Sequence, residues 1–260
     1  MTLSPIPYSD SPYSDKSHPA SVPASPADEA SLRTLICHIG RLMHQLRYID
    51  GVAGNISARL DSQRILATPS ELSKGFLQPD QLIVLDMEGK KTGSAADSTR
   101  NLRPAAELLM HLECYRQRPD VQGVIDAHPP IATALTIAGV SMRTCVIPEA
   151  VIVLGIIPTA AYSTPASVEN VDAVRTLIAQ HDAIMLAYRG SVTVGLDVWQ
   201  AYLKLETLEH TAAILHHAAQ LGPIVPLSPE QVASLLVIRR QLGYWRPGDE
   251  DRFCETCGTC

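Results

Sequence analysis

Short apolar runs of strand length alternate along this chain with longer segments of helical periodicity, and this alternation constrains the fold more than any other feature. From Leu32 to Leu46, apolar residues recur every three or four positions, as on one face of a helix. The run 121–126, in contrast, has the length and composition of a strand. Helices and strands interleaved in this way favour one sheet covered by helices. We therefore predict an α/β sandwich, whose strand order the pattern leaves open.

The remaining elements are predicted in the same way, with capping and turn residues marking their ends. Further predicted helices cover 104–117, 130–137, 168–180, 196–220 and 228–242. Further predicted strands cover 59–60, 65–67, 82–85, 156–160, 183–187 and 191–194. The 260 residues suffice for one large domain or two small ones with a substantial core.

The two ends of the chain differ from its middle in composition. Residues 1–27 are rich in serine and proline and poor in apolar residues. Such a segment cannot offset the entropy lost on ordering, so we predict a disordered tail. Residues 28–243 are the predicted domain, and residues 244–260 are predicted to form a flexible C-terminal tail.

The C-terminal tail carries a C-x-x-C-x-x-C motif. Its members are Cys254, Cys257 and Cys260. The motif could hold zinc or an iron–sulfur cluster, but both normally need four ligands and the tail supplies three. An intermolecular site and a redox-active tail are alternatives, and a flexible end without a chemical role is the interpretation that we favour.

Charge and hydropathy exclude several classes of function. The net charge is −6 and no basic tract is present, so nucleic-acid binding is not expected. No apolar run reaches about 18 residues, the length of a membrane span, and the polar start of the chain does not look like a signal peptide. Cys37, Cys114 and Cys145 lie in apolar contexts and are predicted to be buried, reduced thiols. These features predict a cytoplasmic protein with neither a nucleic-acid nor a membrane partner.

The segment from Val121 to Pro130 holds the first candidate site. Its predicted strand ends in Asp126 and His128, which two prolines follow. Because alternate residues of a strand point to one face, both side chains are expected to project together from the strand end. They are two candidate ligands for a divalent ion, which needs at least three from the protein. His111, on a predicted helix, is expected only to pack or pair locally.

Several further motifs follow one another in a recognisable order. They are Gly51-Val52-Ala53-Gly54-Asn55-Ile56-Ser57, Ala67-Thr68-Pro69-Ser70, Arg103-Pro104-Ala105-Ala106-Glu107, Arg118-Pro119-Asp120, Asp126-Ala127-His128-Pro129-Pro130 and Arg189-Gly190. With these motifs and spacings, the chain from about Ser31 to Leu221 resembles the class II aldolase/adducin family.

The resemblance implies a three-layer α/β/α sandwich with one central mixed, largely antiparallel sheet, and a four-fold tetramer with sites between subunits. In the aldolases of this family, three histidines hold a metal ion, a glutamate acts as acid/base, and a glycine-rich loop and hydroxyls bind a phosphate. Glu107 matches the glutamate, and Asp126 and His128 take the places of two metal ligands. The implied partner is a small-molecule substrate, and the implied cofactor is a divalent ion such as Zn²⁺, Mn²⁺ or Fe²⁺. The matching substrate-binding residues are Gly54, Asn55, Ser57 and Ser70.

The chain departs from the family pattern at chemically important positions. Asp126 stands in place of the first histidine, which favours harder ions. Arg189 stands in place of the last histidine, and a guanidinium does not coordinate a metal. We expect Arg189 to bind a substrate carboxylate or, alternatively, to form an ion pair with Asp126 where the metal would lie. Ala105 and Ala106 replace two serines and Glu71 replaces a glycine, so a sugar phosphate is not the expected substrate.

Two functions follow from this pattern. The first is an aldolase- or decarboxylase-type lyase that acts on a small, non-phosphorylated hydroxy or keto acid through a modified metal site. The second is a non-catalytic binding or scaffold protein that has kept the fold and lost the metal, as in the adducin head domain.

Overall fold

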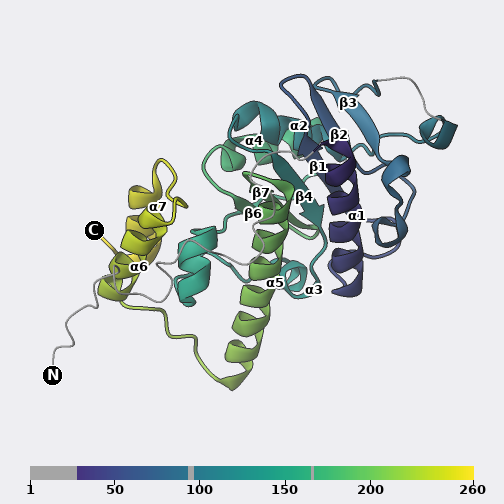
Figure 1. The fold of residues 1–260 in the computed structure, drawn as a ribbon. Coiled ribbons are helices and arrows are strands. Elements are labelled where there is room, and N and C mark those ends of the chain that lie inside the picture. Colours follow the sequence, from purple (N-terminus) through teal and green to yellow (C-terminus); the bar gives the residue numbers. More distant parts are fainter. Residues whose placement is uncertain (1–27, 93–96, 165–166) are drawn as a thin grey trace.

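One seven-stranded sheet runs through the molecule, with helices on both of its faces (Figure 1). The structure, a computed structural model, describes residues 28–92, 97–164 and 167–260. The predicted disordered tail, residues 1–27, lies outside the described residues. The strand order is β3-β2-β1-β4-β7-β6-β5, and every neighbouring pair is antiparallel except β5 and β6. The predicted sandwich with a mixed, largely antiparallel sheet is therefore confirmed.

The elements have the following bounds. The strands are β1 (Asn55–Arg59), β2 (Arg64–Ala67), β3 (Ile83–Asp86), β4 (Gly123–Ala127), β5 (Thr159–Ala160), β6 (Ala183–Leu186) and β7 (Gly190–Gly195). The helices are α1 (Glu29–Gln45), α2 (Leu108–Gln117), α3 (Pro130–Ile137), α4 (Val168–Ile178), α5 (Val198–Leu221), α6 (Pro229–Gln241) and α7 (Asp249–Cys257). Short turns of helix are η2 (Lys74–Phe76), η3 (Pro79–Gln81), η4 (Asp97–Thr99) and η5 (Ala150–Leu154).

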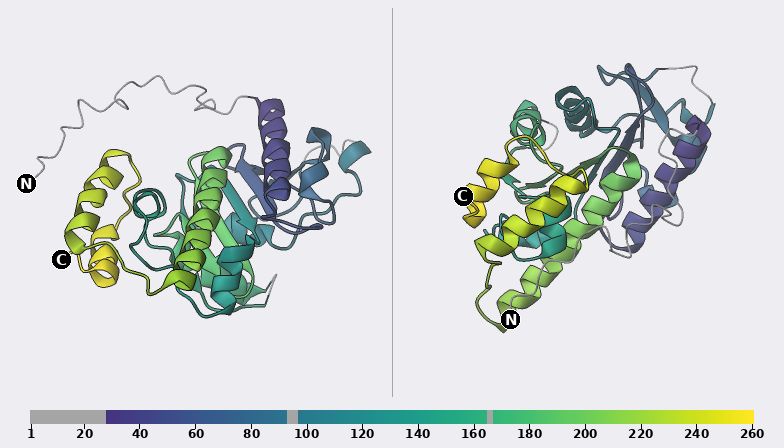
Figure 2. Two further views of the ribbon diagram at one scale, coloured as in Figure 1. Left: turned by 90° about the horizontal axis from the view of Figure 1, so that it is seen from below. Right: turned by 60° about the vertical axis from the view of Figure 1, so that its left-hand side comes forward.

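The helices form two layers, one on each face of the sheet (Figure 2). Side chains of α2 and α4 pack with Val124 of β4 and Val192 of β7 in one apolar cluster. Side chains of α1 and α5 pack with Ile125 of β4 in a second cluster on the opposite face. Consecutive residues of β4 thus face opposite layers, as the pleat of a strand requires. Asp126 follows Val124 by two residues and faces the α2 side, where it lies 2.9 Å from His111.

Two helices begin at an aspartate that caps their first turn. The Asp28 carboxylate accepts a hydrogen bond from the Ser31 amide at 2.9 Å and begins α1. The Asp197 carboxylate accepts one from the Gln200 amide at 2.7 Å and begins α5. Both use the N-cap preference for aspartate, which satisfies an amide that has no partner in the helix.

The helix predicted from residue 104 begins later, at Leu108. Residues 103 and 104 are held extended instead, because the Ser70 amide donates to the Arg103 carbonyl at 2.9 Å and Pro104 pairs with Pro69. The strand predicted at 59–60 begins four residues earlier, at Asn55. The glycine-rich loop therefore passes directly into a central strand.

The C-terminal segment is not the flexible tail that we predicted. Residues 249–257 form α7, and its Phe253 is fully buried in a cluster with Val232 of α6. The Asp249 carboxylate accepts a hydrogen bond from Arg239 of α6 at 2.9 Å. Apolar burial and a buried ion pair thus order a segment that looks polar in the sequence.

The cysteines are divided between paired and free. Disulfides join Cys145 to Cys257 and Cys254 to Cys260. The prediction of a reduced thiol is therefore wrong for Cys145, because α7 brings Cys257 against it. Cys37 and Cys114 are free and buried, as predicted. Among the described helices, none is long and apolar enough to cross a membrane.

Asp182, at the start of β6, is the centre of a buried ionic cluster. Its carboxylate accepts hydrogen bonds from Lys204 at 2.7 Å, Arg118 at 3.0 Å and Arg246 at 2.8 Å. Burial alone would raise the pKa of Asp182, but Lys204 and Arg246 outweigh it and hold the pKa well below its usual range. The cluster joins β6 to α2, α5 and the segment before α7.

His181 should make stability depend on pH. Burial, reinforced by Arg252, lowers the pKa of its imidazole from 6.5 to about 4. Between these values the unfolded chain binds a proton that the folded chain does not. Its contribution to stability is therefore complete above pH 6.5 and is lost as the pH falls towards 4. We expect His181→Gln to flatten the pH dependence of the free energy of unfolding across this window. Urea unfolding at several pH values measures this, and parallel curves for the two proteins would contradict it.

Candidate active site at the ends of three central strands

The candidate site lies where β1, β4 and β7 meet in the middle of the sheet. Asn55 pairs with Asp126 in the β1–β4 register, and Asp126 pairs with Val192 in the β4–β7 register. A Cβ at Gly190 would lie 2.0 Å from the carbonyl oxygen of Ala127, so glycine is required for this close approach. Main-chain pairing thus sets the relative positions of the side chains at this edge.

Asp126 is buried and hydrogen-bonded from two sides. Its Oδ1 accepts from Asn55 Nδ2 at 2.9 Å and lies 2.9 Å from His111 Nε2. Burial opposes ionisation of Asp126, but the His111 and Asn55 hydrogen bonds, with the charge of nearby His128, outweigh it and lower its pKa. The carboxylate is thus kept charged inside the protein.

The network continues from His111 into the interior. His111 Nδ1 lies 2.8 Å from Ser57 Oγ, which lies 2.9 Å from Tyr115 Oη. With Nε2–H donating to Asp126, Nδ1 accepts from the serine hydroxyl, and the tyrosine donates in turn. The order Asp–His–Ser is that of a nucleophilic triad. Ser57 and His111 are, however, fully buried, so no substrate can reach the serine hydroxyl. The series of hydrogen bonds therefore orients Asp126.

Glu107 and Arg189 form the more accessible half of the site. Glu107 ends the turn that leads into α2, and its Oε1 accepts from Arg189 Nη2 at 3.2 Å. The expected alternative of an ion pair between Arg189 and Asp126 is therefore wrong, because Asp126 is held by His111. Arg189 Nη1 is buried and has no partner among the described residues. It is a charged donor ready for an anion.

The exposure of the two carboxylates separates their roles. The Glu107 side chain is 28% exposed, whereas that of Asp126 is 5% exposed. Only Glu107 can therefore exchange a proton with a small molecule without disturbing the interior. Asp126 supplies a fixed negative charge behind it.

Lys74 is a second cation near the site, besides Arg189, and was not predicted. It belongs to η2, is almost fully buried, and donates from Nζ to the carbonyl oxygen of Val52 at 2.6 Å. Burial lowers its pKa, against the opposing charges of Asp126 and Glu107. Lys74 thus holds the glycine-rich loop from behind. Its place between Ser73 and Gly75 gives no periodic or motif signal in the sequence.

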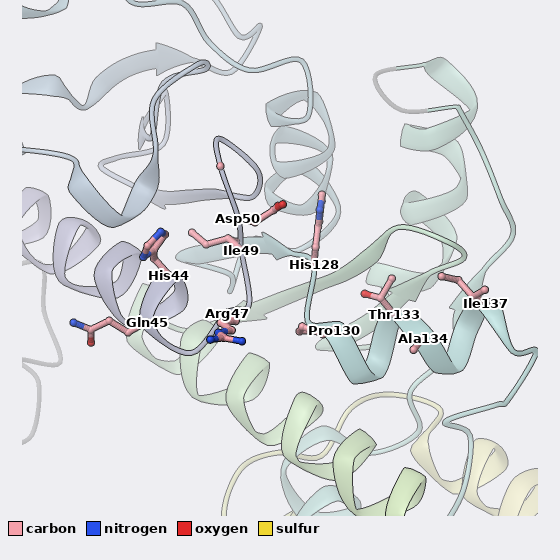
Figure 3. Close-up of a pocket in the computed structure, with 11 residues that line it drawn as sticks. His44, Gln45, Arg47, Ile49, Asp50, His128, Pro130, Thr133, Ala134 and Ile137 are labelled. Carbon is pink, nitrogen blue, oxygen red and sulfur yellow. The ribbon is translucent and has the colours of Figure 1, made fainter.

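A cavity of about 800 Å³ adjoins the site at His128 (Figure 3). The end of α1 and the following loop form one wall, with His44, Arg47 and Asp50, and the side chain of Asp50 points toward His128. The other wall is α3, with Thr133, Ala134 and Ile137. The Glu209 carboxylate fixes that helix by accepting the amides of Ile131 and Ala132, each at 2.8 Å.

The predicted loop residues have mainly internal partners. Gly54 has φ +71°, and a Cβ there would lie 2.4 Å from Ile49, so only glycine fits. Ser70 Oγ donates to the Arg103 carbonyl oxygen at 3.1 Å. The Asn55 amide nitrogen is bound to Asp126, although its Oδ1 has no partner among the described residues. Ser57 is fully buried and bound to His111 and Tyr115.

The donor set for a divalent ion is incomplete. Asp126 and His128 belong to no group of three His, Cys, Asp or Glu side chains that could hold a metal ion within the described part of the chain. The position of the family's last histidine holds a guanidinium, which adds positive charge. The residues of this chain therefore do not by themselves fit a three-ligand metal site.

Comparisons with known proteins agree with this geometry. The family model described as Class II Aldolase and Adducin N-terminal domain matches residues 34–216. The chain is 32% identical to an L-fuculose phosphate aldolase of Methanococcus maripaludis, over 68% of this chain and 91% of that protein. It is 30% identical to a 3-oxo-tetronate 4-phosphate decarboxylase of Haemophilus influenzae, over 70% of this chain and 85% of that protein.

A solved structure from Escherichia coli, described as an aldolase, epimerase or decarboxylase, superposes with a TM-score of 0.71. It is 30% identical, and the match covers 80% of this chain and 98% of that one. An L-fuculose 1-phosphate aldolase structure gives the same TM-score at 21% identity and supports the fold alone.

Proposed function

Because the chain belongs to the class II aldolase and adducin N-terminal domain family, we propose that it is a lyase of the aldolase or decarboxylase type acting on a small, non-phosphorylated hydroxy or keto acid. The observation that carries the proposal is the Glu107–Arg189 pair, in which Arg189 Nη1 has no partner among the described residues. The relatives named as lyases favour this function over a non-catalytic scaffold.

Arg189 is the group that we assign to the substrate carboxylate. Its guanidinium offers two parallel donors: Nη2 holds Glu107, and Nη1 has no partner within the described ranges. We propose that the substrate carboxylate binds at Arg189 beside Glu107, and that the cavity lined by His128 and α3 receives the rest of the substrate. This position leaves the interior network around Asp126 undisturbed.

Glu107 is the general acid/base in this proposal. Breaking a carbon–carbon bond next to a carbonyl leaves the electron pair as an enolate. In the decarboxylation of a 3-keto acid, the carboxylate that Arg189 binds leaves as carbon dioxide, and Glu107 in its acid form then delivers a proton to the enolate carbon. In aldol cleavage, the Glu107 carboxylate instead accepts the substrate's hydroxyl proton as the bond breaks.

The absence of phosphate from the proposed substrate follows from the groups around the loop. The hydroxyls of Ser57 and Ser70 already have protein partners. Ala105 and Ala106 have no hydroxyls to offer, and Glu71 adds a negative charge. The relatives named above carry phosphate in their substrate names, so substrate choice is where we propose that this chain differs from them.

A divalent ion, the assembly and the location complete the proposal. Asp126 and His128 are the donors for Zn²⁺, Mn²⁺ or Fe²⁺, and such an ion would need further ligands. A homo-tetramer is proposed from membership of the family. A cytoplasmic location is also proposed: the free thiols of Cys37 and Cys114 agree with it, and it requires that the two disulfides be reduced there.

The Arg189 assignment is tested by ligand binding. We expect Arg189→Gln to weaken the binding of small 2-keto and 3-keto acids about 10- to 100-fold, because a charge-assisted hydrogen bond contributes about 1.5–3 kcal/mol. Isothermal titration with each acid and its uncharged amide measures this effect. The matched control is Arg64→Gln, on an exposed arginine of β2. Equal affinity for acid and amide in the wild-type protein would overturn the assignment.

A further inference from the structure

Four cysteines from two parts of the chain meet beside α7. Cys145 lies opposite Cys257 with a Cα–Cα distance of 6.2 Å, and Cys254 lies opposite Cys260 at 4.9 Å. Cys254 and Cys257 are three residues apart on one helix, which places their side chains on the same face. The Cys145–Cys257 and Cys254–Cys260 pairs, both disulfide-bonded in the structure, are therefore attached to one turn of α7.

The fourth ligand that the terminal motif lacked is therefore Cys145. It comes from the segment after α3, more than a hundred residues before the motif. Gly258 has φ +69°, a conformation that favours glycine, and it turns the chain after α7 so that Cys260 returns to Cys254. A flexible tail would not need this turn.

The surroundings form a built site. Cys145 is buried in an apolar cluster with Val151, Val232 and Phe253, against which Cys257 packs. The Leu227 amide donates to the Cys145 carbonyl oxygen at 2.8 Å, which fixes the backbone at this ligand. The guanidinium of Arg143 lies next to the site, 3.5 Å from the Thr256 hydroxyl, and supplies positive charge.

We propose that Cys145, Cys254, Cys257 and Cys260 form a structural zinc site in the reduced protein. A cellular thiol such as glutathione supplies two electrons and two protons to each disulfide, which gives four thiols. Binding of Zn²⁺ then releases four protons and leaves a tetrahedral ion held by four thiolates. The complex carries a charge of −2, and Arg143 partly neutralises it.

The geometry favours a single ion over an iron–sulfur cluster. Zinc–sulfur bonds of about 2.3 Å place tetrahedral sulfur atoms roughly 4 Å apart. Cysteine pairs with Cα atoms at 4.9 and 6.2 Å reach that separation with small side-chain rotations. A cluster of several iron atoms would force the four sulfur atoms much further apart.

The proposed ion would fasten the C-terminal helices to the aldolase-like domain. The segment with Cys145 leads into η5, and α7 packs against α6, whose Arg239 donates to the Ile152 carbonyl in η5. Figures 1 and 2 show α6 and α7 together at one end of the molecule. The site is thus separate from Asp126 and His128, and its metal is structural.

Metal content of the full chain, purified with a thiol reductant, tests the proposal. We expect Cys257→Ser and Cys145→Ser each to contain about one equivalent of zinc per chain less than the wild type. Two controls should retain the zinc: Cys37→Ser, on a free buried cysteine elsewhere, and His128→Ala, at the candidate active site. The His128 control separates this outcome from that of the proposed lyase.

A second measurement uses only the wild-type protein, so its result does not depend on whether the cysteine variants fold. Cobalt substituted for zinc should give strong thiolate-to-metal charge-transfer bands, and all four cysteines should resist alkylation until a chelator is added. Intact disulfides without zinc under these conditions would overturn the proposal. Iron with acid-labile sulfide, or zinc lost in His128→Ala and kept in Cys257→Ser, would overturn it as well.

Discussion

Replacing Glu107 by glutamine is expected to lower kcat about 100- to 10,000-fold, the usual contribution of a general acid/base. The amide cannot exchange a proton at neutral pH, whereas its oxygen can still accept the Arg189 hydrogen bond. The melting temperature should therefore hardly change. Steady-state kinetics on the keto acids that bind, together with a thermal melt, measures both quantities.

The control for this prediction is Glu88→Gln, on an exposed carboxylate in the turn after β3. It should leave both kcat and the melting temperature unchanged. If Glu107→Gln kept full activity, the acid/base role would be wrong. If it lowered the melting temperature and had no activity to lose, Glu107 would instead be a structural partner of Arg189.

Replacing Asp182 by alanine is expected to lower the free energy of unfolding by about 3–5 kcal/mol, the usual cost of breaking a buried ion pair from one side. Lys204, almost fully buried, would lose its carboxylate partner, and Arg118 and Arg246 would lose theirs in part. The remaining buried charges would have to take up water or open the structure. Urea unfolding followed by circular dichroism measures the difference.

A matched variant is Asp172→Ala, whose exposed carboxylate pairs with Arg175 on α4. Surface pairs contribute little, so stability should change only slightly. Asp182→Asn offers a second comparison, because it keeps an acceptor and removes the charge. A loss below about 1 kcal/mol for Asp182→Ala would show that the three cations do not depend on this carboxylate.

Much of the fold could be predicted from periodicity because each element has one buried face. The helix predicted at 130–137 has those bounds in α3, and the one predicted at 196–220 is α5 at Val198–Leu221. Strand order could not be predicted, because pairing depends on partners far away in the chain. The terminal helix was missed because its apolar content is almost confined to Phe253, and its burial requires α6 and η5.

At the site, the sequence indicated which residues meet but not how they pair. The two-residue step predicted Asp126 and His128 on one face, but β4 ends at Ala127; Asp126 contacts His111 of α2, and His128 lines the cavity between α1 and α3. The partners of Asp126 come from β1 and α2, and no local pattern links them to it. His111, which was expected only to pack or pair locally, holds that carboxylate inside the protein. Opposite charge alone favoured Arg189 as the partner of Asp126. In the structure Arg189 is hydrogen-bonded to Glu107 instead.

The position of the site on three adjacent inner strands has a consequence for how the specificity of this protein could change. Hydrogen bonds between backbones, which do not depend on side-chain identity, hold the chemical groups of β1, β4 and β7 in place. The loop after α1 and the helix α3 border the cavity without belonging to that ladder. Substitutions there can reshape the ligand space while the reacting groups keep their spacing. The substrate specificity can therefore change while the side chains on β1, β4 and β7 keep their positions.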